Sequence, residues 1–162
     1  MGLKRAFVIG LCLAAVAAVV MLAAVIIRPP KIYISEICPS NSETSKKTAM
    51  QDKNGEPSDW IEIYNPTNRD ISLTGFSLSK NGGGDQPLGG YVIKAHDYII
   101  VYCSSAGFEN ADFPHADFSI GKVSEAEIIL KYDSLQCESI KMPKLNKGVS
   151  YSKNVKGEMY VS

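Results

Sequence analysis

Residues that could perform acid–base or metal chemistry are few in this sequence and lie far apart. The two histidines, His96 and His115, belong to no HExxH, HxH or Cys/His cluster, so a general base or metal ligand is not expected there. Asp59 and Glu62 are close in sequence, but residues three apart on a strand point to opposite faces and do not form a carboxylate pair. The glycines at 82–84 lack the Gly-Lys-Ser/Thr ending of a phosphate-binding loop. We therefore predict no catalytic residue, no cofactor and no enzymatic activity.

Cysteines and acidic loops give no metal pattern either. Cys38, Cys103 and Cys137 follow the N-terminal apolar segment with a spacing that matches no CxxC zinc site. Three cysteines allow at most one internal disulfide, whose pairing the sequence leaves open, and free buried thiols are the expectation. The acidic loop residues lack a DxDxDG spacing, so no metal site is predicted and calcium binding there stays open. These acidic residues are Asp52, Glu56, Asp85, Asp112 and Asp117.

The N-terminal segment has the composition of a membrane anchor. Residues 7–27 form an uncharged stretch of 21 residues, preceded by Lys4 and Arg5 and followed by Arg28. As a helix this stretch would cover roughly 31 Å, the thickness of a bilayer's hydrocarbon core. A cleaved secretory signal is the alternative, but its apolar region is usually shorter and ends at a small-x-small site. We predict that residues 1–31 comprise a cytoplasmic tail, one transmembrane helix and a juxtamembrane segment.

The orientation of the anchor follows from what lies on either side of it. Basic residues flank both ends, so charge alone gives a weak preference. The short N-terminal tail is easily kept in the cytoplasm, whereas the rest of the chain has the pattern of an extracellular-type β domain. We predict a single-pass protein of the cell membrane with a cytoplasmic N-terminus and an extracytoplasmic C-terminal domain.

Residues 32–162 are long enough for one domain with a hydrophobic core. They carry 13 basic and 17 acidic residues, a net charge of about −4. Nucleic-acid binding is therefore not expected, because general nucleic-acid binders show a basic face.

The domain contains a series of short segments with the pattern of β-strands, separated by turn residues, and it has no helical periodicity. This pattern predicts an all-β sandwich of about ten strands. Two hairpins are expected, one from 60–64 returning along 71–78, and one from 91–93 returning along 98–103. Long loops are expected at 39–58 and 104–116. The other predicted strands are 32–37, 117–120, 127–132, 137–141, 149–152 and 159–161.

The motif DWIEIYNPTNRDISLTGFSLS at 59–79 resembles the lamin-tail domain, an immunoglobulin-like β-sandwich, in the type found in bacterial membrane-anchored or exported proteins. The flanking pieces IYISEI, YVIKAHDYIIVY and AEIILKYDSLQCESIKMP follow the family order. The resemblance implies an immunoglobulin-like fold, an accessory binding role, and a signature that serves the fold rather than a ligand. The signature residues are Asp59, Trp60, Ile61, Glu62, Ile63, Tyr64, Asn65, Pro66, Leu73 and Gly75.

These features together favour a binding or scaffolding module that associates with a protein partner at the cell envelope, through the two long loops or an open sheet edge. One alternative, implied by the resemblance, is an accessory N-terminal domain of an exported enzyme such as a spore-coat-type kinase or a hydrolase. Another is carbohydrate or cell-wall binding, which requires exposed aromatic residues on one sheet face. The aromatic candidates are Tyr64, Tyr91, Tyr98, Tyr102, Phe108 and Phe113.

Overall fold

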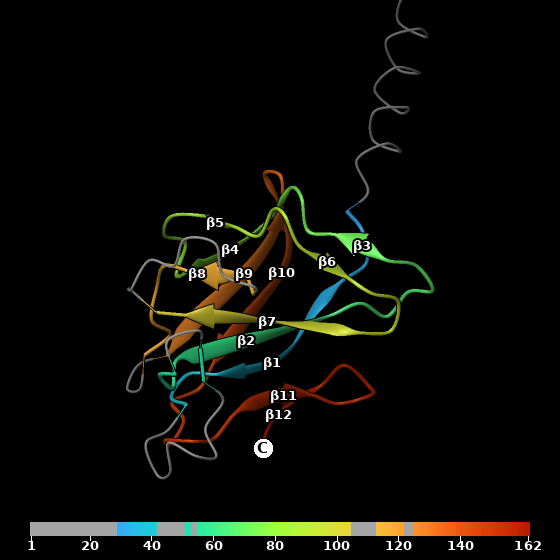
Figure 1. Cartoon of the computed structure of the whole chain (residues 1–162). Helices are drawn as coiled ribbons and strands as arrows, with labels where there is room; N and C mark the ends of the chain where they lie inside the picture. The colour runs from blue at the N-terminus through green and yellow to red at the C-terminus, as the bar shows by residue number, and fades with distance from the viewer. Residues whose placement is uncertain (1–28, 42–50, 53–54, 105–112, 122–124) are drawn as a thin grey trace, which may run out of the picture. The chain divides into compact units, whose positions relative to one another are not determined.

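The computed structural model describes residues 29–41, 51–52, 55–104, 113–121 and 125–162 (Figure 1). The chain divides into two compact units, residues 1–30 and residues 31–162. The predicted transmembrane helix at 7–27 lies outside the described residues. Among the described residues, no helix has the length and apolar character needed to cross a membrane.

Twelve strands make up the described part of the second unit, in three sheets. The six-stranded sheet has the order β12-β11-β1-β2-β7-β8, the four-stranded sheet has the order β10-β9-β4-β5, and β3 pairs with β6. The strand bounds are β1 Tyr33–Cys38, β2 Asp59–Tyr64, β3 Ile71–Ser72, β4 Phe76–Lys80, β5 Gln86–Pro87, β6 Val92–Ile93, β7 Tyr98–Cys103, β8 His115–Ala116, β9 Ala126–Tyr132, β10 Leu135–Met142, β11 Tyr151–Lys153 and β12 Met159–Val161.

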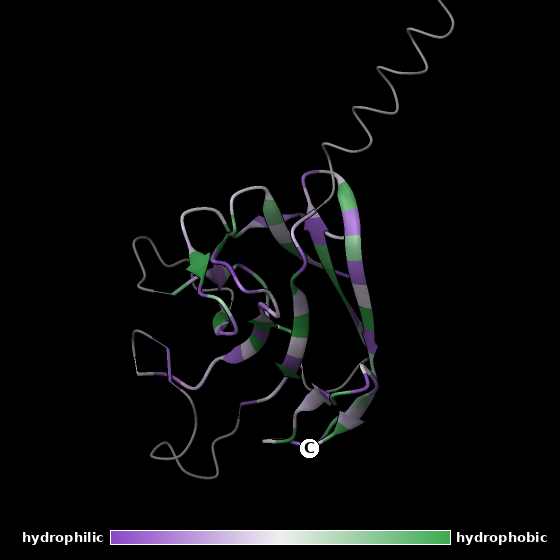
Figure 2. Cartoon of the chain, turned by 90° about the vertical axis from the view of Figure 1, so that its right-hand side faces the viewer, coloured by the Kyte–Doolittle hydropathy of each residue, from purple (hydrophilic) through white to green (hydrophobic). Residues whose placement is uncertain are grey.

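The two larger sheets share one hydrophobic core, as expected for a β-sandwich. Ile61 and Ile63 of β2 enter this core from the six-stranded sheet, and Leu78 and Leu130 enter it from the four-stranded sheet. Apolar and polar residues alternate along the strands, which is visible as bands of colour in Figure 2. The predicted all-β immunoglobulin-like architecture is confirmed for this unit.

A β-bulge in β1 explains why Ile34 and Ile37, three residues apart, are both fully buried. The register between β1 and β2 shifts between Ile34 and Glu36, so one extra residue is accommodated and the alternation of faces is reset. Ile34 then lies opposite Ile63, and Ile37 opposite Ile61. The bulge thus keeps both isoleucines of the first strand in the core.

The predicted hairpin between 60–64 and 71–78 is wrong. The returning segment is two strands: β3 pairs with β6, and β4 pairs with β5 and β9 in the other sheet. The chain turns between them at Leu73–Phe76, where the Phe76 N–H donates to the Leu73 carbonyl at 2.9 Å. Gly75 takes φ +87° in this turn. A glycine adopts that conformation readily, and the turn carries the chain from one sheet to the other.

The predicted hairpin between 91–93 and 98–103 is also wrong, because β6 pairs with β3 whereas β7 pairs with β2. The turn at 94–97 therefore joins two sheets. By contrast, β4 pairs with β5, β9 with β10, and β11 with β12, so the segments between these strands are turns within one sheet.

The predicted strand at 117–120 is wrong as well, and a short strand lies just before it instead. β8, at His115–Ala116, runs parallel to β7 along the edge of the six-stranded sheet. The backbone N–H groups of Ile120 and Gly121 donate to the Asp59 carboxylate, at 2.8 and 3.2 Å. Because these donors are bonded to a side chain, they are not available for a strand ladder.

Replacing Gly75 by alanine is expected to destabilise the domain by about 2–4 kcal/mol. A left-handed conformation costs a non-glycine residue about 1–2 kcal/mol, and steric overlap adds about 1–2 kcal/mol. An added Cβ would lie 3.0 Å from Asp133 Oδ1 and 3.1 Å from Tyr132 Cε2. Urea denaturation followed by tryptophan fluorescence measures the change.

Gly90→Ala is the matched control for that measurement, because Gly90 has φ +92° and its Cβ would meet nothing within 4 Å. It should show the cost of the backbone conformation alone, about 1–2 kcal/mol. Equal losses in the two variants would show that the contacts with Tyr132 and Asp133 do not matter.

Candidate functional site

The signature motif divides between the two faces of β2. Ile61 and Ile63 face the core. Asp59 shares this parity, and its carboxylate also accepts a hydrogen bond from Ser119 Oγ at 3.0 Å. Trp60, Glu62 and Tyr64 have the opposite parity and lie on the outer face of the six-stranded sheet. This alternation separates the residues that face the shared core from those on the outer face of the sheet.

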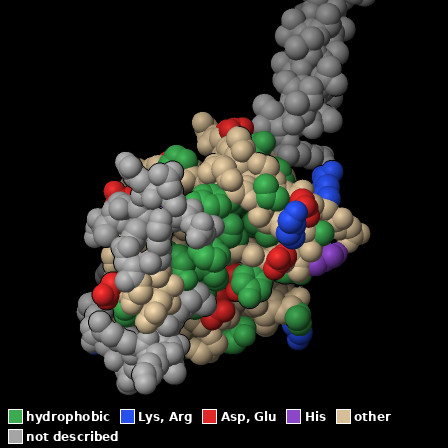
Figure 3. Space-filling view, viewed as in Figure 1, with side chains coloured by type: hydrophobic (Ala, Val, Ile, Leu, Met, Phe, Trp, Pro, Cys, Tyr) green, Lys and Arg blue, Asp and Glu red, His purple; other side chains and the backbone are tan. Residues whose placement is uncertain are grey.

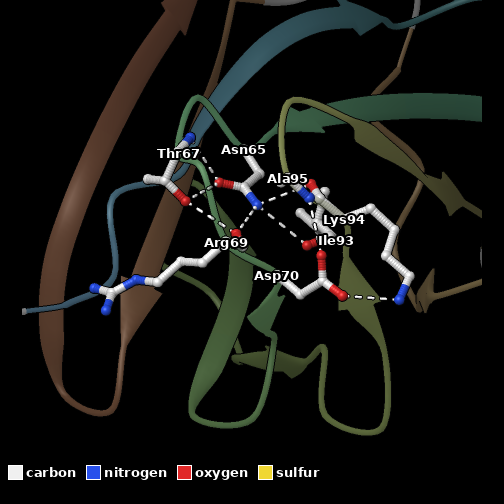
Figure 4. A network of polar contacts seen from close by, with 7 residues as sticks. All are labelled: Asn65, Thr67, Arg69, Asp70, Ile93, Lys94 and Ala95. Atoms are coloured by element: carbon white, nitrogen blue, oxygen red, sulfur yellow. Dashed lines mark hydrogen bonds and ion pairs between the residues drawn. The ribbon is translucent and has the colours of Figure 1, made fainter.

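Asn65 is the centre of a polar network that joins the turn after β2 to the turn before β7 (Figure 4). Its side chain is fully buried. The Nδ2 group donates to three backbone carbonyls, those of Arg69 at 2.8 Å, Ile93 at 3.2 Å and Lys94 at 2.8 Å. The Oδ1 atom accepts from the N–H and the hydroxyl of Thr67, at 3.0 and 2.7 Å. One amide therefore satisfies five backbone or hydroxyl groups and fixes two turns.

Asp70 strengthens the same junction from the surface. Its carboxylate pairs with Lys94 Nζ at 2.8 Å and accepts from the Ala95 N–H at 3.0 Å. These hydrogen bonds lower the pKa of Asp70, the Lys94 contact being the largest cause. Of the remaining signature residues, Pro66 follows Asn65 in the turn, Leu73 is fully buried, and Gly75 makes the crossing between sheets.

The outer face of the six-stranded sheet carries a row of three tyrosines, one from each of three neighbouring strands. Tyr33, Tyr64 and Tyr98 are cross-strand partners on β1, β2 and β7. Tyr33 and Tyr64 make an edge contact with ring centroids 5.6 Å apart, and Tyr98 is 56% exposed. Figure 3 views this face and shows hydrophobic side chains gathered over β2 and β7. Sequence reasoning missed the row because it depends on strand register.

A second apolar group lies at the opposite end of the same face. Cys38, Trp60 and Ile100 are buried together, and Tyr102 packs against them. Tyr102 also contacts the exposed Phe113, with ring centroids 6.2 Å apart, and burial raises the pKa of the Tyr102 hydroxyl. The register of β1, β2, β7 and β8 brings the ends of the predicted loops 39–58 and 104–116 together here. Phe108 lies outside the described residues.

Two carboxylates lie between these aromatic groups. Glu36 and Glu62 are cross-strand partners on β1 and β2. Glu62 accepts a hydrogen bond from Ser35 Oγ at 2.6 Å, and Glu36 accepts one from Ser150 Oγ. Like charges directly opposite each other destabilise a sheet, so this pair is a cost to the fold.

Glu138 connects the two sheets at the bulge of β1, a role that sequence reasoning also missed. It belongs to β10 of the four-stranded sheet, next to a second register shift between Gln136 and Glu138. Its carboxylate accepts from the Ile34 N–H at 2.8 Å and pairs with Lys153 of β11. The Lys153 ammonium also lies 4.6 Å from the centre of the Tyr33 ring. The bulge, two sheets and the tyrosine row thus meet at one ion pair.

The two histidines lie apart, His96 in the turn before β7 and His115 at the start of β8. His96 bonds to Asn68, with Nε2 2.6 Å from Oδ1. His115 Nε2 lies 3.0 Å from Ser104 Oγ, a distance at which an imidazole can activate a hydroxyl. The N–H of Ser104 is already bonded to the Ala116 carbonyl at 3.2 Å, so it does not serve as an oxyanion donor. The pair fastens β8 to the end of β7.

Acidification is expected to weaken the domain at this contact. Burial lowers the pKa of His115 below 6.5, although Asp117 and Asp52 act in the opposite direction. The unfolded chain then binds this proton more readily than the folded one, so the contribution is complete above about pH 6.5 and is lost as the pH falls below it. Urea midpoints measured between about pH 8 and about pH 5 should fall less steeply in His115→Gln than in the original protein. Identical slopes would contradict the prediction.

The cysteines in the domain are free. Cys38 lies opposite Trp60 on the outer face of the sheet, whereas Cys103 lies in the core, so their side chains point apart and cannot be bridged without moving the backbone. Burial raises the pKa of Cys38 to about 11. The expectation of a buried thiol is wrong for Cys137, which is exposed at the bulge of β10.

The acidic loop residues have different partners, although Asp52 and Glu56 share one turn, in which the Glu56 N–H donates to Asp52 Oδ1 at 3.1 Å. Asp52 bonds to Ser58 Oγ at 2.6 Å and Asp85 pairs with Lys131 at 2.6 Å, while Asp117 lies beside Gln86. Glu56 is exposed, and Asp112 lies outside the described residues. Within the described part of the chain, no three acidic, cysteine or histidine side chains are grouped so that they could hold a metal ion.

The sheet order, the shared core and the junction at Asn65 define an immunoglobulin-like β-sandwich, and a row of three tyrosines lies on the outer face of its six-stranded sheet. The family model of the lamin tail domain matches residues 28–138, more than half of the chain. The chain therefore belongs to the lamin tail domain family. A search of curated proteins found no match. The match ends within β10, so β11 and β12, which extend the six-stranded sheet beyond β1, lie outside it.

Proposed function

We propose that this chain is a protein-binding module that holds a partner against the outer face of its six-stranded sheet. The observation that carries the proposal is the row of Tyr33, Tyr64 and Tyr98, with Trp60 and Tyr102 further along the same face. Tyrosine and tryptophan are enriched at protein interfaces, because they offer a large apolar area together with a polar group. Lamin tail domain membership supports an interaction role in preference to catalysis.

Site-specific photocrosslinking tests this assignment. A photoreactive amino acid replaces Tyr98 on the outer face or, as the matched control, Leu135 on β10 of the other sheet. Both positions are about half exposed, at 56% and 48%. The proposal expects one protein to be captured from position 98 and not from position 135 in intact cells. Capture of the same protein from both positions, or from position 135 alone, would place the binding surface elsewhere.

We also propose that residues 7–27 anchor the module in the cell membrane, with the N-terminus in the cytoplasm and the domain outside. The uncharged length of the segment supports this location. The chain should resist alkaline extraction of membranes, and protease added to intact cells should remove the domain and leave a membrane-embedded stub. A chain recovered in the soluble fraction would refute the anchor.

Carbohydrate binding is the second candidate, because the exposed Tyr98 and the half-buried Tyr33 and Tyr64 lie on one sheet face. Sugar rings stack on flat aromatic surfaces, but the rings of Tyr33 and Tyr64 are inclined at 60° and Lys153 covers one face of Tyr33. The face is therefore better shaped for a side chain than for a row of sugars. A glycan array probed with the full chain decides between them: saturable binding to a defined oligosaccharide, lost in Tyr98→Ala, would favour this candidate.

A further inference from the structure

The structure already holds one cation beside the tyrosine row, at the contact between the two sheets. Lys153 is placed between a carboxylate and an aromatic ring: its ammonium pairs with Glu138 and lies 4.6 Å from the centre of the Tyr33 ring. The two charged side chains are largely buried, with exposed fractions of 13% for Lys153 and 20% for Glu138. A carboxylate and a tyrosine face together stabilise an ammonium through an ion pair and a cation–π contact.

The neighbouring strand repeats this combination without a cation. Glu62 and Tyr64 are two residues apart on β2 and share its outer face, and Tyr64 is the cross-strand partner of Tyr33. Within the described part of the chain, the Glu62 carboxylate accepts one hydrogen bond, from the Ser35 hydroxyl, and no lysine or arginine pairs with Glu62 or Glu36. Burial is the largest cause of the raised pKa of Tyr33, and the negative charges of Glu138 and Glu62 act in the same direction.

Charge complementarity indicates what this face would accept. Glu36 lies directly opposite Glu62, so two like charges are held side by side in the sheet. A cation placed between them would relieve that repulsion, and the flanking Tyr64 and the exposed Tyr98 would cover the apolar stem of a long side chain. An anionic lipid or nucleic acid would instead meet the carboxylates and be repelled.

We infer that the outer face docks a basic segment of the partner protein, with a lysine or arginine side chain received between Glu36 and Glu62 and packed on Tyr64 and Tyr98. This inference rests on the proposed protein-binding function and specifies the chemistry of the partner. Arginine fits the site better than lysine, because its planar guanidinium can bond two carboxylates and stack on a ring at the same time.

A peptide titration tests the inference on the full chain in detergent micelles. The probe is a synthetic peptide of alternating arginine and glycine, and the comparison peptide alternates serine and glycine. Trp60 is the only tryptophan and lies two residues from Glu62 on the same face, so its fluorescence reports occupancy. We expect a saturable change with the arginine peptide only, and an affinity that falls as salt is added.

Two matched variants locate the site. Glu62→Gln keeps an oxygen that can accept from Ser35 but removes the charge, and it should weaken binding about tenfold, the effect of losing one charge-assisted hydrogen bond. Glu127→Gln is the control, because Glu127 is also bonded to a serine, Ser139 at 2.5 Å, but lies on β9 of the other sheet. Binding to Glu127→Gln should change less than about twofold.

Tyr98→Ala provides a second test that does not alter charge, with an expected loss of about twofold to fivefold from the missing cation–π contact. Thermal denaturation measures whether each variant is folded. If Glu62→Gln does not fold, the affinity of Tyr98→Ala for the arginine peptide decides the outcome. Equal weakening by Glu62→Gln and Glu127→Gln, equal binding of the two peptides, or unchanged affinity in Tyr98→Ala would overturn the inference. A crosslinked partner at position 98 whose captured segment lacks lysine and arginine would overturn it while leaving the protein-binding function intact.

Discussion

Replacing Asn65 by alanine is expected to destabilise the domain by about 3–5 kcal/mol, the largest effect we predict for a single substitution. The variant leaves the carbonyls of Arg69, Ile93 and Lys94 without the amide that bonds them, and it removes the acceptor for Thr67. An unsatisfied buried polar group costs about 1–3 kcal/mol, and several are created together. The urea midpoint, followed by the fluorescence of Trp60, measures the loss.

Asn68→Ala is the control for this prediction, because Asn68 is an exposed asparagine in the same turn whose side chain contacts His96. It should change stability by less than about 0.5 kcal/mol. Asn65→Asp separates the two halves of the amide, since it keeps an acceptor for Thr67 but places a carboxylate oxygen against three carbonyls. We expect it to be as unstable as the alanine variant. A small loss in Asn65→Asp would show that the donated bonds contribute little.

Replacing Glu138 by alanine is expected to cost about 3 kcal/mol. The change leaves Lys153 without its carboxylate partner, and it removes the acceptor for the Ile34 N–H at the β1 bulge. Breaking a largely buried ion pair is costly because the remaining charge stays desolvated. Since the contact joins two sheets, the variant should also expose the β11–β12 hairpin to protease. The free energy of unfolding and limited proteolysis measure the two effects.

Asp85→Ala is the comparison for Glu138, because Asp85 pairs with Lys131 at 2.6 Å in a more exposed position. Exposed ion pairs contribute about 0–1 kcal/mol, so its effect should be small. Replacing both Glu138 and Lys153 by apolar residues should recover part of the lost stability, since no buried charge then remains. If Glu138→Ala and Asp85→Ala had equal effects, the contact between the sheets would not be a stabilising feature of this fold.

Strand existence and strand faces could be predicted well from sequence. The segments that became β1, β2, β7, β9 and β10 were placed within one or two residues of their ends, and the inward direction of Ile61 and Ile63 follows from alternation. These features are local, because the period of two is a property of each strand alone.

Strand partners could not be predicted in the same way. A chain reversal within a few residues is typical of a hairpin, and both expected hairpins proved to be crossings between sheets. The crossings depend on Gly75 and on the Asn65 amide, which bonds residues up to 29 positions away. A pattern among neighbouring residues does not predict hydrogen bonds between residues so far apart in sequence.

The candidate binding face shows the same division. Tyr33, Tyr64 and Tyr98 are separated by more than 30 residues along the chain, and only the register of β1, β2 and β7 makes them one row. The contact of Glu138 with Ile34 and Lys153, which joins the two sheets, likewise depends on register shifts in β1 and β10 that lie close together in space.

By itself, then, the sequence determined an all-β domain of the lamin tail type, with its core positions set by alternating hydrophobicity. Tertiary structure alone decided which strands pair, where the chain changes sheets, and which side chains meet on the outer face. The physical reason is that burial is determined by a residue's own polarity and its position along one strand. Pairing is determined instead by the competition among all strands for shared hydrogen bonds and a common core.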